Sequence, residues 1–373
     1  MKVANRIVFS MIILIAVLLI GGGIFLWWDF LARRANDVPV AQPGATDIPQ
    51  LSVMAKNLNI PWALDFLPDG SIIFTERTGT FRLIKPDGLL LAQPILTLSD
   101  VAAQGEGGLL GIALHPSFAI NHYVFIYYTY STSGTLQNHV VRYTWDGQTL
   151  VGPHIILDGI PGGGIHNGGR VKFGPDACLY VTTGETGNTS LSQNLASLGG
   201  KILRIKDDGA IPADNPFPGS PVYSYGHRNP EGLAWDSQGR LWATEHGSSA
   251  YDELNLIQPG RNYGWPLMRG DETVPGMETP VLNSGTDTWA PSGIAFYPGS
   301  LYFAGLRGQS LFRVDLADSP LILKTYFNGN FGRLREVVVG PDGMLYLLTS
   351  NRDGRGVPTS DDDQMLRINP SKL

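Results

Sequence analysis

One hairpin phrase recurs along the chain, and it restricts the fold more than any other feature of the sequence. A short apolar run leads into a turn built from Pro, Asp and Gly, and a strand of alternating apolar residues follows. An Asp-Gly pair supplies the positive φ angles of a tight hairpin, and period-2 strands flank such a turn. The six copies, of which the second is the loosest, cover residues 65–79, 112–129, 171–185, 233–247, 294–308 and 337–351.

Hairpins repeated at intervals of roughly 45–60 residues are typical of a β-propeller, in which each blade is a small antiparallel sheet. We therefore predict an all-β, six-bladed β-propeller over residues 51–373. The abundance of glycine (46) and proline (26), with only 16% charged residues, agrees with an all-β chain rich in turns. A two-sheet sandwich is the alternative, but it would not repeat one phrase at such even spacing.

The N-terminal region has a different character. Residues 7–28 contain no charged side chain and are long enough to cross a bilayer as a helix, and Trp27 and Trp28 lie where an interfacial aromatic belt would fall. We predict a transmembrane anchor over 1–34 and a polar, proline-containing linker over 35–50. The protein would then be a single-pass cell-membrane protein with its propeller outside the cytoplasm. A cleaved signal peptide is the alternative.

Charge and cysteine content exclude some classes of partner. The net charge is −6 and no basic stripe appears, which argues against nucleic acid. The single cysteine, Cys178, cannot form an intramolecular disulfide.

Arginines recur at the ends of the repeats, where the loops of a propeller meet at one mouth. Arginine forks match carboxylates and phosphates, so together they predict a pocket for a polyanionic ligand. The alternative is that each arginine pairs with an acidic residue of its own blade. The residues concerned are Arg170, Arg228, Arg307, Arg333 and Arg335.

His166 lies in the glycine-rich stretch "GGGIHNGGR" (162–170), which suggests a large flat ligand against the backbone. A neutral imidazole there could act as a general base, and a hydrogen-bonded structural histidine is the alternative. Asp252 and Glu253 form an acidic pair near flexible backbone, an arrangement that suits calcium.

Five motifs in consistent order resemble one family: "GEGGLLGIALHPSF", "HNGGRVKFGPD", "YGHRNPEGLAWD", "EHG…DELNLIQPGRNYGWP" and "APSGIAFY". From about residue 50 onward the chain resembles the soluble quinoprotein glucose/sorbosone dehydrogenases, and within them the bacterial aldose sugar dehydrogenases. The resemblance implies a six-bladed propeller that binds pyrroloquinoline quinone (PQQ) and Ca²⁺ and oxidises the C1 hydroxyl of an aldose sugar to the lactone. No haem-binding Cys-x-x-Cys-His is present, so electrons would pass to a separate acceptor.

The resemblance also implies roles for individual residues. His166 would be the general base as hydride passes to the quinone, and Arg228 would stabilise charge at the quinone oxygen. The carbonyls of Gly247 and Ser248 would bind the calcium that polarises PQQ, acting as a Lewis acid. Glu253 and Tyr263 would bind a second, structural calcium. The PQQ contacts would be Glu106, Arg228, Asn229, Arg307, Arg333 and Arg335.

Three positions depart from the family pattern. Glu106 replaces a glutamine, which places a negative charge beside a polyanionic cofactor. Ile165 replaces an aspartate of the glucose dehydrogenase branch, so we expect His166 to lack that carboxylate partner. Ser248 replaces a proline, a change that leaves a carbonyl ligand available. Two other functions stay open: a non-catalytic membrane-anchored propeller that binds a glycan or a protein, and a calcium-dependent lactonase.

Overall fold

The computed structural model describes residues 50–373. The predicted anchor over 1–34 and all but the last residue of the predicted linker lie outside the described residues. Between residues 50 and 373, no helix is long and apolar enough to cross a membrane.

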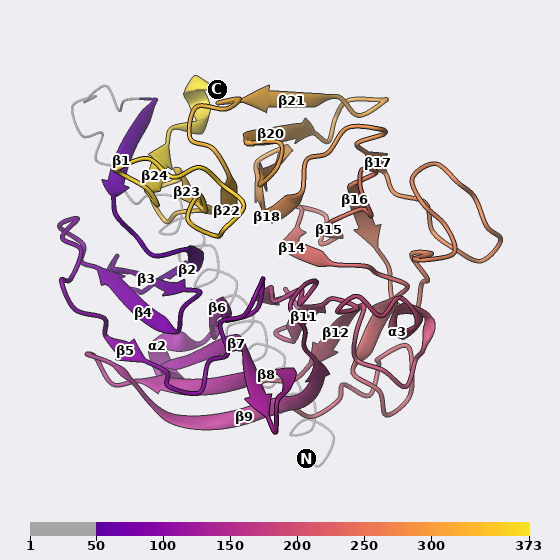
Figure 1. The fold of residues 1–373 in the computed structure, drawn as a ribbon, viewed down its shortest axis with the longest axis horizontal. Helices are drawn as coiled ribbons and strands as arrows, with labels where there is room; N and C mark the ends of the chain where they lie inside the picture. The colour runs from indigo at the N-terminus through magenta and orange to yellow at the C-terminus, as the bar shows by residue number, and fades with distance from the viewer. Residues whose placement is uncertain (1–49) are drawn as a thin grey trace, which may run out of the picture. The chain divides into compact units, whose positions relative to one another are not determined.

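The described chain forms six antiparallel sheets of four strands each, arranged around a central axis (Figure 1). In the first three blades the strands follow one another in chain order. Blade 1 comprises β2 (Pro61–Phe66), β3 (Ile72–Glu76), β4 (Thr80–Ile84) and β5 (Leu96–Thr97). Blade 2 comprises β6 (Leu109–Leu114), β7 (Tyr123–Thr132), β8 (Thr135–Trp145) and β9 (Leu150–Pro161). Blade 3 comprises β10 (Val171–Phe173), β11 (Leu179–Thr183), β12 (Lys201–Ile205) and β13 (Val222–Tyr225).

Blades 4 and 5 repeat this order, and blade 6 takes strands from both ends of the described chain. Blade 4 comprises β14 (Pro230–Trp235), β15 (Leu241–Glu245), β16 (Glu253–Ile257) and β17 (Leu282–Asn283). Blade 5 comprises β18 (Pro291–Tyr297), β19 (Ser300–Gly305), β20 (Ser310–Asp315) and β21 (Leu323–Tyr326). Blade 6 comprises β22 (Leu334–Val339), β23 (Leu345–Thr349), β24 (Met365–Ile368) and β1 (Leu51–Ala55). Over residues 50–373, three one-turn helices lie in connections or at the C-terminal end: α2 (Phe118–Asn121), α3 (Ser190–Gln193) and η1 (Pro370–Lys372).

The prediction of six blades is confirmed, because each hairpin phrase falls on the first two strands of one blade. The turn chemistry is as expected: Gly70 and Gly343, each after an aspartate, have φ angles of 89° and 73°. The second strands β3, β11, β15 and β23 are buried at every position. Neighbouring blades cover both faces of these strands, so their apolar residues form the packing between blades.

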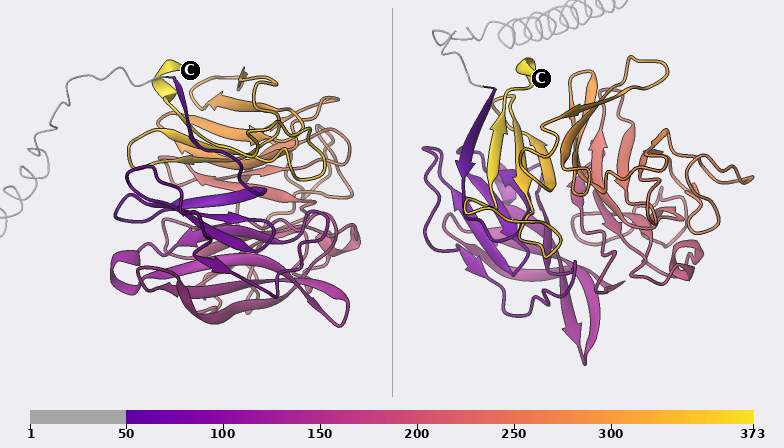
Figure 2. Two further views of the ribbon diagram at one scale, coloured as in Figure 1. Left: turned by 60° about the vertical axis from the view of Figure 1, so that its left-hand side comes forward. Right: turned by 45° about the horizontal axis from the view of Figure 1, so that its top comes forward.

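The ring is closed by pairing the first described strand with the last one. β1 runs antiparallel to β24, with Leu51 opposite Ile368 and Val53 opposite Leu366. Figure 2 shows β1 beside the C-terminal strands in both further views. Closure in this way covers an edge of β24 that would otherwise be free to pair with another chain.

The antiparallel order decides where functional side chains gather. The first strand of each blade begins at the same rim at which the second strand ends, because the two are joined by a hairpin at the other rim. Residues that precede β10 or β14 therefore lie near residues that follow β3, β15 or β19.

Candidate active site

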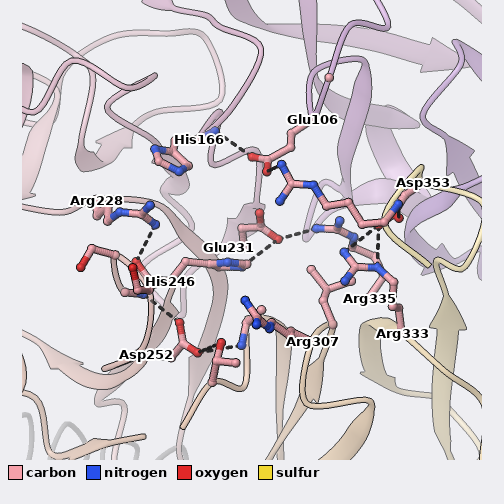
Figure 3. A pocket seen from close by; sticks show the side chains of 18 of the residues that line it. Glu106, His166, Arg228, Glu231, His246, Asp252, Arg307, Arg333, Arg335 and Asp353 are labelled. Atoms are coloured by element: carbon pink, nitrogen blue, oxygen red, sulfur yellow. Dashed lines mark hydrogen bonds and ion pairs between the residues drawn. The ribbon is translucent and has the colours of Figure 1, made fainter. Parts of the chain in front are cut away.

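A cavity of about 430 Å³ opens at this rim (Figure 3). Its lining comes from loops and strand ends of all six blades, which is the convergence that the propeller predicts. The side chains of its walls are mostly charged or polar. They are Arg77, Glu106, His166, Arg228, Glu231, His246, Ser248, Ser249, Asp252, Thr288, Leu306, Arg307, Gln309, Arg333, Arg335, Asp353 and Arg355, with Gly105, Gly247 and Ala290 between them.

Most of the predicted site residues meet in this pocket. His166, Arg228, Glu106, Arg307, Arg333, Arg335, Gly247 and Ser248 all line it. Asn229, Glu253 and Tyr263 do not, and neither does Arg170.

The pocket has an excess of positive charge. Six arginines (Arg77, Arg228, Arg307, Arg333, Arg335 and Arg355) face four carboxylates (Glu106, Glu231, Asp252 and Asp353). Burial opposes the charged form of His246, but Glu231, Asp252 and Glu106 together outweigh burial and raise the pKa of His246. The arrangement suits a ligand with several negative charges.

Five charged lining residues were not predicted from the sequence: Arg77, Glu231, His246, Asp353 and Arg355. A signal was present for two of them, because Arg77 and His246 directly follow β3 and β15, as Arg307 nearly follows β19. The ends of the second strands could therefore have been compared across all six repeats.

The histidine predicted as a base is held by a carboxylate. Nδ1 of His166 lies 2.9 Å from Oε1 of Glu185, which follows β11 and is buried. A carboxylate only accepts, so Nδ1 carries the proton, and in the neutral ring Nε2 is the nitrogen that keeps its lone pair. His166 thus lacks the aspartate at position 165, as expected, but it is not without a carboxylate partner. Ile165 does replace the aspartate, but Glu185 provides the carboxylate from the next strand of the blade.

Arg333 and Arg335 lie at the start of β22 and each pairs with a carboxylate. Arg333 donates to Oδ2 of Asp353 from Nε at 2.9 Å and from Nη2 at 2.8 Å. Arg335 donates to Glu231. Burial alone would raise the pKa of Glu231, but the charge of Arg335 holds it well below its usual range.

Arg228 is placed differently. Its Nη1 donates to the carbonyl oxygen of His246 at 3.3 Å, and its guanidinium lies 5.5 Å from the ring centre of Trp265. No carboxylate within the described chain forms an ion pair with Arg228 or with Arg307. Both cations are therefore available to an anionic ligand.

Arg170 does not reach the mouth, which corrects its place among the pocket arginines. It is buried, pairs with Glu336 and donates from Nε to the carbonyl oxygen of Glu231 at 2.9 Å. Its guanidinium also lies 4.3 Å from the ring centre of Trp62. Arg170 therefore stabilises the packing between blades 1, 3, 4 and 6.

Asn229 has a supporting position behind the pocket. It is 1% exposed, its Oδ1 accepts from the backbone N–H of Gly168 at 2.9 Å, and its Nδ2 donates to Glu231 at 3.0 Å. In this arrangement both polar atoms of its amide are already bonded to protein groups. Its contacts fix the loop that carries His166.

The glycines around His166 have a different cause from the one expected. A Cβ at Gly162 would lie 2.8 Å from backbone atoms of Gln137, and one at Gly168 would lie 2.5 Å from the carbonyl oxygen of Thr182. A Cβ at Gly169 would lie 2.7 Å from the Leu110 side chain. Only Gly164 has open space around it. The glycines mainly allow the loop to pack closely against the protein itself.

Gly247 and Ser248 belong to a loop held by Asp252. One carboxylate oxygen of Asp252 accepts from Gly247 N–H at 2.8 Å, and the other accepts from Trp289 and Ala290 N–H at 2.6 and 2.8 Å. Over residues 50–373, the carbonyl oxygens of Gly247 and Ser248 accept no hydrogen bond. They therefore keep lone pairs that a cation could use.

Glu253 lies away from the pocket, directly opposite Glu245 across the β15–β16 pair. Burial raises the pKa of Glu253 to about 8, and the charge of Glu245 adds to the effect. Beside it, Oδ1 of Asn255 is buried without a hydrogen-bond partner. A bound cation would offset the repulsion between the two carboxylates and would give the amide oxygen of Asn255 a partner.

Tyr263 can contribute to such a site through one atom only. Its hydroxyl donates to the carbonyl of Leu256 at 2.7 Å and accepts from Gln258 N–H at 2.8 Å. Its backbone carbonyl is the oxygen left for a metal. In the described residues, no three His, Cys, Asp or Glu side chains are grouped to hold a metal ion, so backbone or amide oxygens would have to complete either site.

Residues 58–358 match the family model described as Glucose / Sorbosone dehydrogenase. The chain belongs to this family. The family predicted from the sequence is therefore confirmed, and its matched region spans nearly the whole propeller.

Three relatives agree with this assignment. Aldose sugar dehydrogenase YliI of Escherichia coli is 33% identical, over 86% of this chain and 92% of its own. Quinoprotein glucose dehydrogenase B of Acinetobacter calcoaceticus is 37% identical, over 58% of this chain and 52% of its own. The structure of the PQQ-bound form of an aldose sugar dehydrogenase from Streptomyces coelicolor is 44% identical, with a TM-score of 0.80 over 86% of this chain and 99% of that one.

Proposed function

We propose that the chain is a PQQ- and calcium-dependent dehydrogenase that oxidises the C1 hydroxyl of aldose sugars to lactones. The observation that carries the proposal is the pair of His166 and Glu185 at the edge of an arginine-rich pocket. A scaffold that only binds a partner has no need for a buried carboxylate behind a histidine in such a pocket. The relatives described as aldose sugar and glucose dehydrogenases support the same reaction class.

The residues present fit a polyanionic quinone. PQQ carries three carboxylates, and the pocket offers more arginines than carboxylates. Three of these arginines, Arg77, Arg228 and Arg307, have no ion-pair partner in the described chain. A volume of about 430 Å³ lies in the ordinary range for ligand sites, roughly 300–1,000 Å³. Arg228, Arg307, Arg333 and Arg335 would hold the cofactor, and PQQ, when bound, supplies the quinone that accepts the electrons taken from the sugar.

His166 would act on the proton of the sugar. Its Nε2 is the basic nitrogen, because Nδ1 donates to Glu185. As Nε2 takes the proton of the C1 hydroxyl, the ring becomes positive, and the carboxylate of Glu185 stabilises that charge. Arg228 would place a fixed positive charge where negative charge develops during oxidation.

Calcium has two candidate positions. The free carbonyl oxygens of Gly247 and Ser248 would hold one ion at the pocket wall. Glu253, with the carbonyl of Tyr263 and the unpaired Oδ1 of Asn255, would hold a structural ion. The first ion would polarise bound groups in the pocket as a Lewis acid.

We also propose that a separate protein or small molecule accepts the electrons, and that residues 1–34 anchor the chain with its propeller outside the cytoplasm. Fractionation of cells that express the full chain tests the second proposal. Recovery in the membrane fraction, lost when residues 1–49 are deleted, is expected. Equal recovery of both forms in the soluble fraction would overturn it.

Reconstitution tests the reaction itself. Protein incubated with PQQ and Ca²⁺ should reduce an artificial dye when given aldoses, and the lactone should appear in equal amount. His166→Gln should keep PQQ binding, measured by absorbance titration, and lower kcat by about 10²–10⁴-fold. The exposed His154 on β9 supplies the control, since His154→Gln should match the unmodified protein.

Two results would contradict the proposal. No turnover with a broad panel of sugars and alcohols would exclude the dehydrogenase, and lactone hydrolysis without PQQ would favour the lactonase. Full activity of His166→Gln would remove His166 as the base while leaving the reaction in place.

A further inference from the structure

We propose that Glu106, held by Arg355, is a positioning residue for His166 and not a ligand of the cofactor. The inference rests on the proposed function, because it concerns the histidine that would act as the base. It also explains why a carboxylate can replace the family's glutamine beside a polyanionic ligand.

Glu106 forms two hydrogen bonds with the loop that carries His166. Its backbone N–H donates to the carbonyl oxygen of Gly164 at 2.9 Å, and its Oε2 accepts from the backbone N–H of His166 at 2.8 Å. Gly105 allows this approach: its φ is 60°, and a Cβ there would lie 2.0 Å from the oxygen of Gly164. The two segments, separated by about 60 residues in sequence, are therefore built against each other.

His166 needs such support because of its backbone conformation. Its φ is 52°, in the left-handed region that residues other than glycine seldom adopt. Glu106 holds its N–H, and Glu185 holds its Nδ1. With both the backbone and the ring fixed by carboxylates, Nε2 has one direction in which to act.

The charge of Glu106 is neutralised within the protein. Oε1 of Glu106 lies 2.7 Å from Nη2 of Arg355, whose side chain is 58% exposed at the rim. One carboxylate oxygen therefore has a hydrogen-bond donor within the chain, and the other has an ion-pair partner. A cofactor carboxylate would be repelled by Glu106 and attracted to Arg355, so the pair as a whole adds no net charge to the pocket.

The contact also connects His166 to the arginines of blade 6. Arg355 lies two residues after Asp353, and Asp353 pairs with Arg333 (Figure 3). The loop after β23 thus contacts both Arg333, which would bind the cofactor, and Glu106, which accepts from the backbone N–H of His166.

Three variants separate positioning from cofactor binding. Glu106→Ala removes both side-chain contacts and should lower kcat by about 10-fold or more, with the KM for sugar changed less than about twofold and PQQ binding not weakened. Glu106→Gln keeps an oxygen acceptor for the N–H of His166 and should recover most of that kcat. Arg355→Gln should weaken PQQ binding roughly fivefold, because it leaves Glu106 unpaired, and adding Glu106→Gln should restore the affinity.

Arg261→Gln is the matched control. Arg261 is an exposed arginine that pairs with Glu278 at 3.5 Å, away from the pocket. It should match the unmodified protein in kcat and in PQQ affinity.

A measurement without cofactor or sugar keeps this inference separate from the proposed function. Nuclear magnetic resonance of protein with isotope-labelled histidine rings would follow His166, assigned with His166→Gln, beside the other six histidines. Glu106→Ala should shift or broaden the His166 ring signal, while Glu106→Gln should leave it in place. Unchanged signals from the other rings would show that both variants are folded.

Two outcomes would overturn the inference. Weaker PQQ binding with unchanged kcat in both Glu106 variants would make Glu106 a cofactor ligand. An unaltered His166 ring signal and unaltered kcat in Glu106→Ala would remove the positioning role. If the unmodified protein oxidises no sugar with PQQ, the proposed function fails while the ring signals still decide the contact.

Discussion

Arg170 and Arg307 carry the same charge and were both predicted to face the mouth, yet their surroundings give them different roles. Arg170 is 5% exposed and paired with Glu336, also buried. Arg307 is exposed and lines the pocket. A buried arginine contributes through the partner it neutralises, whereas an exposed one is free to contact a ligand.

Replacing Arg170 should therefore destabilise the fold. Arg170→Met leaves Glu336 as an unpaired buried carboxylate and should lower the free energy of unfolding by about 3–5 kcal/mol. Chemical denaturation of the cofactor-free protein measures this change. Arg307→Gln is the comparison and should stay within roughly 0.5 kcal/mol of the unmodified protein. Equal stability of the two variants would show that Arg170 is not needed for packing.

At the scale of elements, the pair of strands β15 and β16 brings two carboxylates together. Glu245 is not free to move, since it accepts from Nδ1 of His227 at 2.7 Å and from the backbone N–H of Arg228. Burial, and after it the charge of Glu245, raises the pKa of Glu253 opposite it. An ordered cation at this pair would stabilise the blade that also carries Arg228.

Replacing Glu253 tests whether calcium stabilises the fold at this pair of carboxylates. Addition of Ca²⁺ should raise the thermal unfolding midpoint of the unmodified protein, and chelation should reverse the rise. In Glu253→Gln the rise should be mostly lost, while the calcium-free protein should be as stable as the unmodified one or more so, because a neutral amide replaces a buried carboxyl whose charged form is disfavoured. Differential scanning calorimetry at fixed pH measures both. An undiminished calcium effect in Glu253→Gln would place the ion elsewhere.

For the whole molecule, closure of the ring depends on one strand from the start of the described chain. β1 contributes the fourth strand of blade 6 and covers the edge of β24. The pocket lies across all six blades, so any opening of the ring would move its arginines apart.

Deletion of residues 1–56 removes β1 and should lower the thermal midpoint by roughly 5–10 °C, since apolar contacts of β1 are lost and an edge is exposed. It should also weaken PQQ binding. Deletion of residues 1–49 alone is the control and should leave the midpoint of the propeller unchanged. Equal midpoints for the two deletions would show that closure by β1 does not support the ring.

The blade count and the hairpins could be predicted from short-range sequence patterns. Turn residues such as the Asp-Gly pairs and the period-2 strands act over a few positions, so six copies of one phrase predicted six blades. The arginines at repeat ends were found in the same way, because a repeat end in sequence is a rim position in space. The strand β1 carries no such phrase, and its place beside β24 was not predictable locally.

The sequence by itself thus determined the blade count, the inner strands and the approximate location of the pocket. The tertiary structure decided which charges meet. Glu185 beside His166, Glu336 beside Arg170 and Arg355 beside Glu106 are pairs 19, 166 and 249 residues apart. The first pair forms within one blade, whereas ring closure brings the other two together, and no local pattern encodes a contact between blades. The physical reason is that turns and strand periodicity are short-range, whereas ion pairs depend on the final positions of all six blades.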